Sequence, residues 1–146
     1  MRSGVVLLAG ILGFAPAGLA QTVWQADLQI RSLAVSQTED RLTARVVVVS
    51  EFGSARAVRL ELLLPVGVGL LEQSPGCEAS PGPEGVREPR ARVICRLGDL
   101  PPRASRVIVV VTTLPPPGVN CVFGVIALSD TPDPRPGNNF AEKAIP

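Results

Sequence analysis

The chain has 146 residues and a formal net charge of +1, and 46% of its residues are hydrophobic although only 3% are aromatic. This length suits a single domain with a substantial core, and the absence of a basic block or an aromatic platform argues against a nucleic-acid-binding protein. The 14 glycines and 15 prolines are too many for long helices and cluster between the apolar runs, where they mark turns. Because the core must be built from Val, Leu, Ile and Ala, the composition favours an all-β fold.

The N-terminus has the three parts of a secretory signal peptide. Arg2 is the positive region, residues 5–14 form an apolar run, and Gly18-Leu19-Ala20 is a small-residue end. The apolar run is shorter than the roughly 20 residues that span a bilayer. We therefore predict that residues 1–20 are removed by cleavage after Ala20, with 15–17 as a second possible site.

The mature chain, residues 21–146, is predicted to be one domain that is secreted or periplasmic and has no transmembrane segment. Apolar and polar residues alternate along it with the period of a β-strand. The segments expected as strands are 27–31, 42–49, 57–64, a short edge strand at 68–71, 91–97, 106–114, 121–127 and a closing segment at 140–145. The segments expected as turns or loops are 36–41, 74–89 and 98–103. Seven or eight such strands without a helical period predict an immunoglobulin-like antiparallel β-sandwich.

Several motifs resemble one known family. They are Leu64-Pro65-x-Gly67-Val68, Val93-x-Cys95-Arg96-Leu97-Gly98-Asp99-Leu100-Pro101, Ser129-Asp130-Thr131-Pro132-Asp133-Pro134 and Gly137-Asn138-Asn139. In this order they resemble the DUF11 repeat domain, a family of immunoglobulin-like modules on bacterial and archaeal envelope and secreted proteins. The resemblance spans about 26–144 and implies an extracellular architectural or adhesive module without catalytic residues. This chain departs from the family pattern at Cys121, where the family has an apolar residue other than cysteine.

The chain has three cysteines, and cysteines of an exported protein tend to pair. We favour a disulfide between Cys77 and Cys95, because they flank the Pro/Gly-rich segment and match the spacing of the resembled family. Cys121 is then a possible free thiol, either buried and inert beside Phe123 or available for an intermolecular disulfide. A nucleophilic role would need a base, and the chain has no histidine.

Asp130, Asp133, Asn138 and Asn139 bring oxygen ligands together in one segment, so they are weak candidates for a calcium site. The same residue types also form ordinary turns by bonding to their own backbone, and we favour that interpretation. The sequence contains no nucleophile elbow, phosphate-binding loop or Cys/His cluster. We therefore expect no metal, no cofactor and no enzymatic activity.

These features predict an exported, non-catalytic structural or protein-binding module of the cell envelope. Its partner would be another envelope protein or a cell-surface polymer. Val47, Val49 and Leu63 occupy outward positions of their strands and either form an interaction patch or lie covered by other segments. The alternative is a self-assembling pilus-type or secretion-machinery subunit that exchanges strands, for which residues 22–25 are too short a donor.

Overall fold

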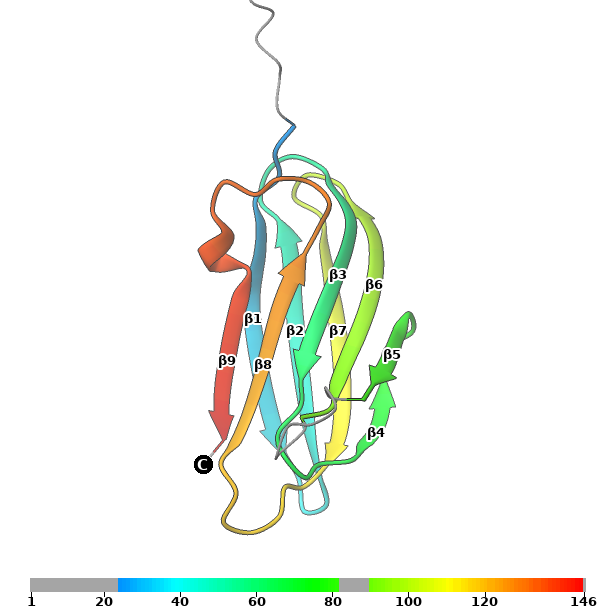
Figure 1. The fold of residues 1–146 in the computed structure, drawn as a ribbon, viewed down its shortest axis with the longest axis vertical. Helices are drawn as coiled ribbons and strands as arrows, with labels where there is room; N and C mark the ends of the chain where they lie inside the picture. Colours follow the sequence, from blue (N-terminus) through cyan, green and yellow to red (C-terminus); the bar gives the residue numbers. More distant parts are fainter. Residues whose placement is uncertain (1–23, 82–89, 146) are drawn as a thin grey trace, which may run out of the picture.

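A computed structural model describes residues 24–81 and 90–145, so the predicted leader lies outside the described residues. The chain forms two antiparallel sheets packed face to face (Figure 1). Sheet A has the strand order β1-β2-β7-β4, and sheet B has the order β5-β6-β3-β8-β9. The bounds are β1 Leu28–Gln37, β2 Arg41–Ser50, β3 Ala55–Leu63, β4 Leu70–Gln73, β5 Cys77–Ser80, β6 Arg92–Leu100, β7 Ser105–Thr113, β8 Cys121–Leu128, the 3-10 helix η1 Pro136–Asn138 and β9 Phe140–Ile145. The predicted all-β sandwich is confirmed.

The strand order is that of an immunoglobulin-like sandwich. Strands β1-β2-β7-β4 take the A-B-E-D positions, and β9-β8-β3 take the G-F-C positions. Sheet B also contains β6, which pairs with β3, and β5, which pairs with β6. One departure is that β4, at the D position, comes before these two strands in the chain rather than after them. The chain must therefore change from sheet A to sheet B between β4 and β5.

The described residues contain nine strands, one more than the highest number predicted. The additional strand is β5, which lies within the segment 74–89 that the sequence predicts as a loop. It pairs with β6 from Cys77 opposite Cys95 to Ser80 opposite Arg92. The prediction was wrong here because proline and glycine surround β5, and only its pairing with a distant strand makes it extended.

Two predicted turns are shorter than expected. Strand β1 continues to Gln37, and β6 continues through Gly98 to Leu100. Gly98 has a φ of 70° and lies at an irregularity in the pairing of β6 with β3. Beyond it the ladder resumes with Leu100 opposite Ala55, so the glycine marks a bulge rather than the end of the strand.

The core between the two sheets is aliphatic, with Phe123 as a fully buried aromatic residue. Alternate residues of each central strand point into it, as the periodicity predicts. The side chains with the least exposed surface include Leu28, Leu42, Val46, Val48, Val58, Leu60, Leu62, Leu64, Val93, Leu100 and Phe123. In β7 the core face is formed by Ile108 and Val110, which places Val107 on the outer face. Within the described residues, no helix is long and apolar enough to cross a membrane.

Candidate functional site

Three connections gather at one end of the sandwich, together with residues 24–27, which lead into β1 (Figure 1). They are β2–β3 (51–54), β6–β7 (101–104) and β8–β9 (129–139). We call this region the loop end. It corresponds to the end at which immunoglobulin variable domains carry their B–C and F–G binding loops. Loops held by a rigid scaffold are common locations for binding residues, so this end is the first place to look for a site.

Hydrogen bonds between the connections hold the loop end together. The N–H of Ala26 donates to the carbonyl of Pro132 (3.1 Å), and the N–H of Asp27 donates to the carbonyl of Phe52 (3.1 Å). The N–H of Ser50 donates to a carbonyl of the β6–β7 connection (3.1 Å). The lead-in to β1 and all three connections are therefore fixed relative to one another.

Asp27 is a charged residue buried at the loop end, with only 1% of its surface exposed. Its carboxylate accepts a hydrogen bond from the side-chain amide of Asn138 (2.8 Å) and contacts the guanidinium of Arg135. The alternating pattern places Asp27 on the wet face of the first strand, and this prediction was wrong. Asp27 lies one residue before β1, and its burial depends on the β8–β9 connection folding over it, which local sequence does not reveal.

The predicted calcium candidates do not converge on one point. The carboxylate of Asp133 accepts main-chain hydrogen bonds from Leu28 (2.9 Å) and Arg135 (2.7 Å). Asn138 donates to Asp27, and Asp130 is exposed. The side-chain oxygens of Asn138 and Asn139 are buried and have no hydrogen-bond partner among the described residues. Within residues 24–81 and 90–145, no three His, Cys, Asp or Glu side chains are grouped as metal ligands would be.

We expect that removing calcium leaves the melting temperature of the mature protein unchanged. The carboxylate of Asp133 is occupied by main-chain N–H groups, and the guanidinium of Arg135 beside Asp27 already provides a positive charge. Thermal unfolding followed by circular dichroism, with EGTA and with added calcium chloride, tests this expectation. A melting temperature that rises with calcium and returns with EGTA would contradict it.

A hollow of about 570 Å³ opens at the loop end. It is lined by Trp24, Gln25, Gly53, Ser54, Arg56, Pro102, Asp130, Thr131 and Pro132. Trp24 is the only tryptophan of the chain, and 83% of its surface is exposed. The exposed side chains of Arg56 and Asp130 form no ion pair with any described residue. Sequence reasoning missed Trp24 and Arg56, because neither belongs to a motif and they meet only in the folded chain.

Backbone conformations that are rare outside glycine also occur in or beside the loop end. Among the described residues, Ala57 has a φ of 49° and Arg103 has a φ of 63°. The N–H of Ala57 is held by the carboxylate of Asp99 (2.9 Å), and the N–H of Arg103 donates to the carbonyl of Ser50 (2.6 Å). Such conformations persist only where neighbouring contacts enforce them, and they are enriched at ligand sites. They add a second reason to regard this end as functional.

Replacing Gly53 with alanine is expected to lower the free energy of unfolding by about 2 kcal/mol, from left-handed strain and overpacking together. Gly53 has a φ of 70°, and a Cβ there would lie 2.0 Å from the carbonyl oxygen of Gln25. Urea unfolding measures the loss. Gly137→Ala is the matched control, because a Cβ at Gly137 has no neighbour within 4 Å. Equal stabilities of the two variants would contradict the expectation.

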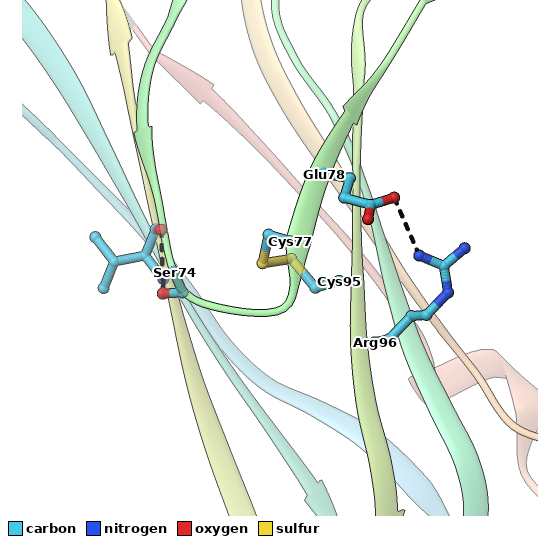
Figure 2. Close-up of a disulfide and its surroundings, with 6 residues drawn as sticks. Ser74, Cys77, Glu78, Cys95 and Arg96 are labelled. Atoms are coloured by element: carbon cyan, nitrogen blue, oxygen red, sulfur yellow. Dashed lines mark hydrogen bonds and ion pairs between the residues drawn. A yellow bond between two sulfur atoms is a disulfide. The ribbon is translucent and has the colours of Figure 1, made fainter.

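The predicted disulfide between Cys77 and Cys95 is present and joins the edge strand β5 to β6 (Figure 2). It therefore lies within sheet B, whereas the disulfide of antibody domains links the two sheets. Figure 2 also shows the ion pair between Glu78 and Arg96 (3.2 Å) beside it. The bond fixes the chain just after it has crossed from one sheet to the other.

Cys121 lies toward the opposite end of the sandwich and is 5% exposed. It lines a hollow of about 280 Å³ together with the proline-rich β7–β8 connection. Burial raises the pKa of the Cys121 thiol above its ordinary value, and the nearby guanidinium of Arg90 offsets this by a smaller amount. A buried thiol with a raised pKa is a poor nucleophile, so the geometry supports the buried alternative over the intermolecular disulfide.

Val47, Val49 and Leu63, which the sequence places on the outward faces of their strands, do not form a single patch. Val47 and Val49 lie in β2 of sheet A, whereas Leu63 lies in β3 of sheet B. Val49 is only 1% exposed, and Val47 is partly buried opposite Val107. An interaction patch made of these three residues is therefore excluded by the division of the strands between the sheets.

No protein-family model and no curated protein matches the chain. Among solved structures, it is similar to an uncharacterised protein from Nocardia farcinica described as having an immunoglobulin-like fold, with 13% identity, a TM-score of 0.45, and coverage of 83% of this chain and 97% of that chain. It also aligns with AvmM, described as catalysing macrocyclization in alchivemycin A biosynthesis, with 18% identity, a TM-score of 0.36, and coverage of 84% and 86%. Identities and TM-scores this low carry no information about activity.

Proposed function

We propose that this chain is an exported, non-catalytic binding module of the cell envelope and that the loop end is its binding surface. The observation that carries the proposal is the hollow, where Trp24, Arg56 and Asp130 come together from three separate segments. Hydrogen bonds between the connections hold this surface in place before any partner arrives. Such preorganisation lowers the entropic cost of binding.

Two further observations support an exported module. The disulfide between Cys77 and Cys95 is of a kind that persists in oxidising compartments and is rare in the cytosol. The resemblance to DUF11 domains, which are found on envelope and secreted proteins, suits the same setting. The absence of histidine and tyrosine from the sequence and the burial of Cys121 leave few groups for acid–base or nucleophilic catalysis.

The alternative, a subunit that assembles by strand exchange, needs a sheet edge that can accept a donor strand. The edges of this sandwich carry features that oppose such pairing. Strands β4 and β5 have four residues each, and β1 has a pairing irregularity between Ile30 and Ser32. Strand β9 carries Glu142 and Lys143. Short, bulged or charged edges discourage strand addition, so they favour the binding module.

Capture of envelope material by the immobilised mature protein tests the proposal. Three proteins are compared: the wild type, a double variant of the hollow with Trp24→Ala and Arg56→Gln, and a control double variant with Phe140→Ala and Arg45→Gln. Phe140 and Arg45 are also exposed, but neither side chain lines the hollow. We expect the wild type and the control to retain the same envelope component and the hollow variant to lose it.

The protein for this experiment is recovered from the periplasm or the medium, where we expect it to begin at Gln21. Equal melting temperatures of the three proteins show that the substitutions leave the fold intact. Retention by none of the proteins, or equal retention by all three, would contradict the proposal.

A further inference from the structure

The hollow at the loop end combines one aromatic ring, one guanidinium and one carboxylate. From this combination we propose that it binds a carboxylated sugar, a uronic acid unit of an acidic surface polysaccharide. This inference rests on the proposed function, because it names the ligand class for the same binding surface.

Trp24 provides the platform for the sugar ring. Its indole is largely exposed at the rim of the hollow, where burying it against a ligand would remove a large apolar area from water. One face of a pyranose ring carries mainly C–H groups, so it packs flat against an indole while the hydroxyls stay at the edge. Tryptophan suits such a surface because it offers a large rigid ring and a polar N–H.

Arg56 provides the partner for the sugar carboxylate. Its guanidinium is exposed and forms no ion pair with a described residue, whereas the backbone around it is fixed. The N–H of Arg56 donates to the hydroxyl of Thr131 (3.0 Å), and its carbonyl accepts the N–H of Asp130 (2.9 Å). These bonds fix the backbone that carries the side chain, and the unpaired guanidinium can match a planar carboxylate with two parallel hydrogen bonds.

Asp130 distinguishes a sugar carboxylate from other anions. It lies in the β8–β9 connection, lines the hollow and can accept hydrogen bonds from sugar hydroxyls. A polyphosphate chain offers further negative charges and no hydroxyl that could donate to Asp130, so Asp130 would repel it beside the single guanidinium of Arg56. A ligand with one negative charge and neighbouring hydroxyls therefore fits the hollow better than a phosphate does, and a neutral peptide would leave Arg56 unpaired.

The remaining surroundings agree with a polymeric acidic ligand. Gln25 and Ser54 line the hollow and offer further polar groups for sugar hydroxyls. Arg103, in the β6–β7 connection, is exposed and forms no ion pair within the described part of the chain. A volume of about 570 Å³ lies within the range of small-ligand sites. An extra positive charge beside the hollow would attract neighbouring carboxylates of the same polymer.

The single tryptophan makes the test specific, because the chain has one tryptophan and no tyrosine and its intrinsic fluorescence reports on the hollow. The full mature protein is titrated with oligogalacturonate, with a neutral dextran oligosaccharide of equal length and with polyphosphate. We expect a saturable change of the Trp24 emission with oligogalacturonate alone. Arg56→Gln should weaken the binding about tenfold or more, as the loss of a charge-assisted pair predicts. Arg45→Gln is the matched control and should bind as the wild type does.

Three outcomes would overturn the inference: no saturable change with oligogalacturonate, an equal response to polyphosphate, or unchanged binding by Arg56→Gln. Calorimetry measures binding without fluorescence, so it can also be applied to Trp24→Ala. We expect this variant to bind oligogalacturonate as weakly as Arg56→Gln does. If envelope capture still depends on the hollow while oligogalacturonate fails to bind, the sugar class is wrong and the proposed function stands. If oligogalacturonate fails to bind and envelope capture does not depend on the hollow either, the proposed function is wrong as well.

Discussion

Phe123→Ala is expected to lower the free energy of unfolding by about 3–5 kcal/mol, the usual cost of removing a buried phenylalanine. The ring has no exposed surface and lies in β8, between β3 and β9 in sheet B. Its neighbours in the core are mainly aliphatic side chains held by two hydrogen-bonded sheets. Because the sheets cannot easily move together, most of the removed volume should remain as a cavity. For a domain whose total stability is about 5–15 kcal/mol, this is a large fraction.

Guanidinium unfolding followed by circular dichroism measures the effect. Phe140→Ala is the matched control, because this phenylalanine is 49% exposed at the start of β9. Its loss should change stability by about 0.5 kcal/mol or less, as is usual for surface positions. A loss at Phe123 no greater than the loss at Phe140 would show that the core does not lie between the sheets as described.

Removing the disulfide, by replacing Cys77 and Cys95 with alanine, is expected to cost roughly 3 kcal/mol in the chain-entropy model. The two cysteines are separated by 18 positions in the sequence. Immediately before the chain crosses to sheet B, the N–H of Ser74 donates to the carbonyl of Val109 in sheet A (3.0 Å). The hydroxyl of Ser74 accepts the N–H of Val109 (2.9 Å). The disulfide secures the other side of this crossing. Without it, the described contacts that hold the segment are non-covalent, namely the short ladder between β5 and β6 and the exposed ion pair between Glu78 and Arg96.

A reductant provides the control for this prediction. Dithiothreitol should destabilise the wild type to about the level of the double variant and should leave the double variant unchanged. Cys121 stays in both proteins, so its oxidation state cannot explain the difference. Coincident unfolding curves for the oxidised wild type and the double variant would contradict the expected contribution of the bond.

Much of the candidate site could not have been predicted from the sequence. The sequence indicates Asp130 as a calcium candidate, whereas in the structure its side chain lines the hollow. Trp24 and Arg56 stand apart in the sequence and belong to no motif. They come together only because the order of strands in the two sheets brings the lead-in, the start of β3 and the β8–β9 connection to one end. Such contacts depend on long-range pairing, which local patterns do not encode.

The strands of the core, and therefore the fold class, follow from the pattern of residues along the chain. Alternation in β2, from Leu42 to Val48, identifies the buried face correctly, because the two faces of a strand are distinguished by a period of two residues. Which segments pair, that β5 is a strand and that Asp27 is buried are evident only in the folded chain. These features depend on partners far away in the chain: β6 for β5, and Arg135 and Asn138 for Asp27. Hydrophobic periodicity is a local property, whereas strand pairing and the burial of charge require the folded chain.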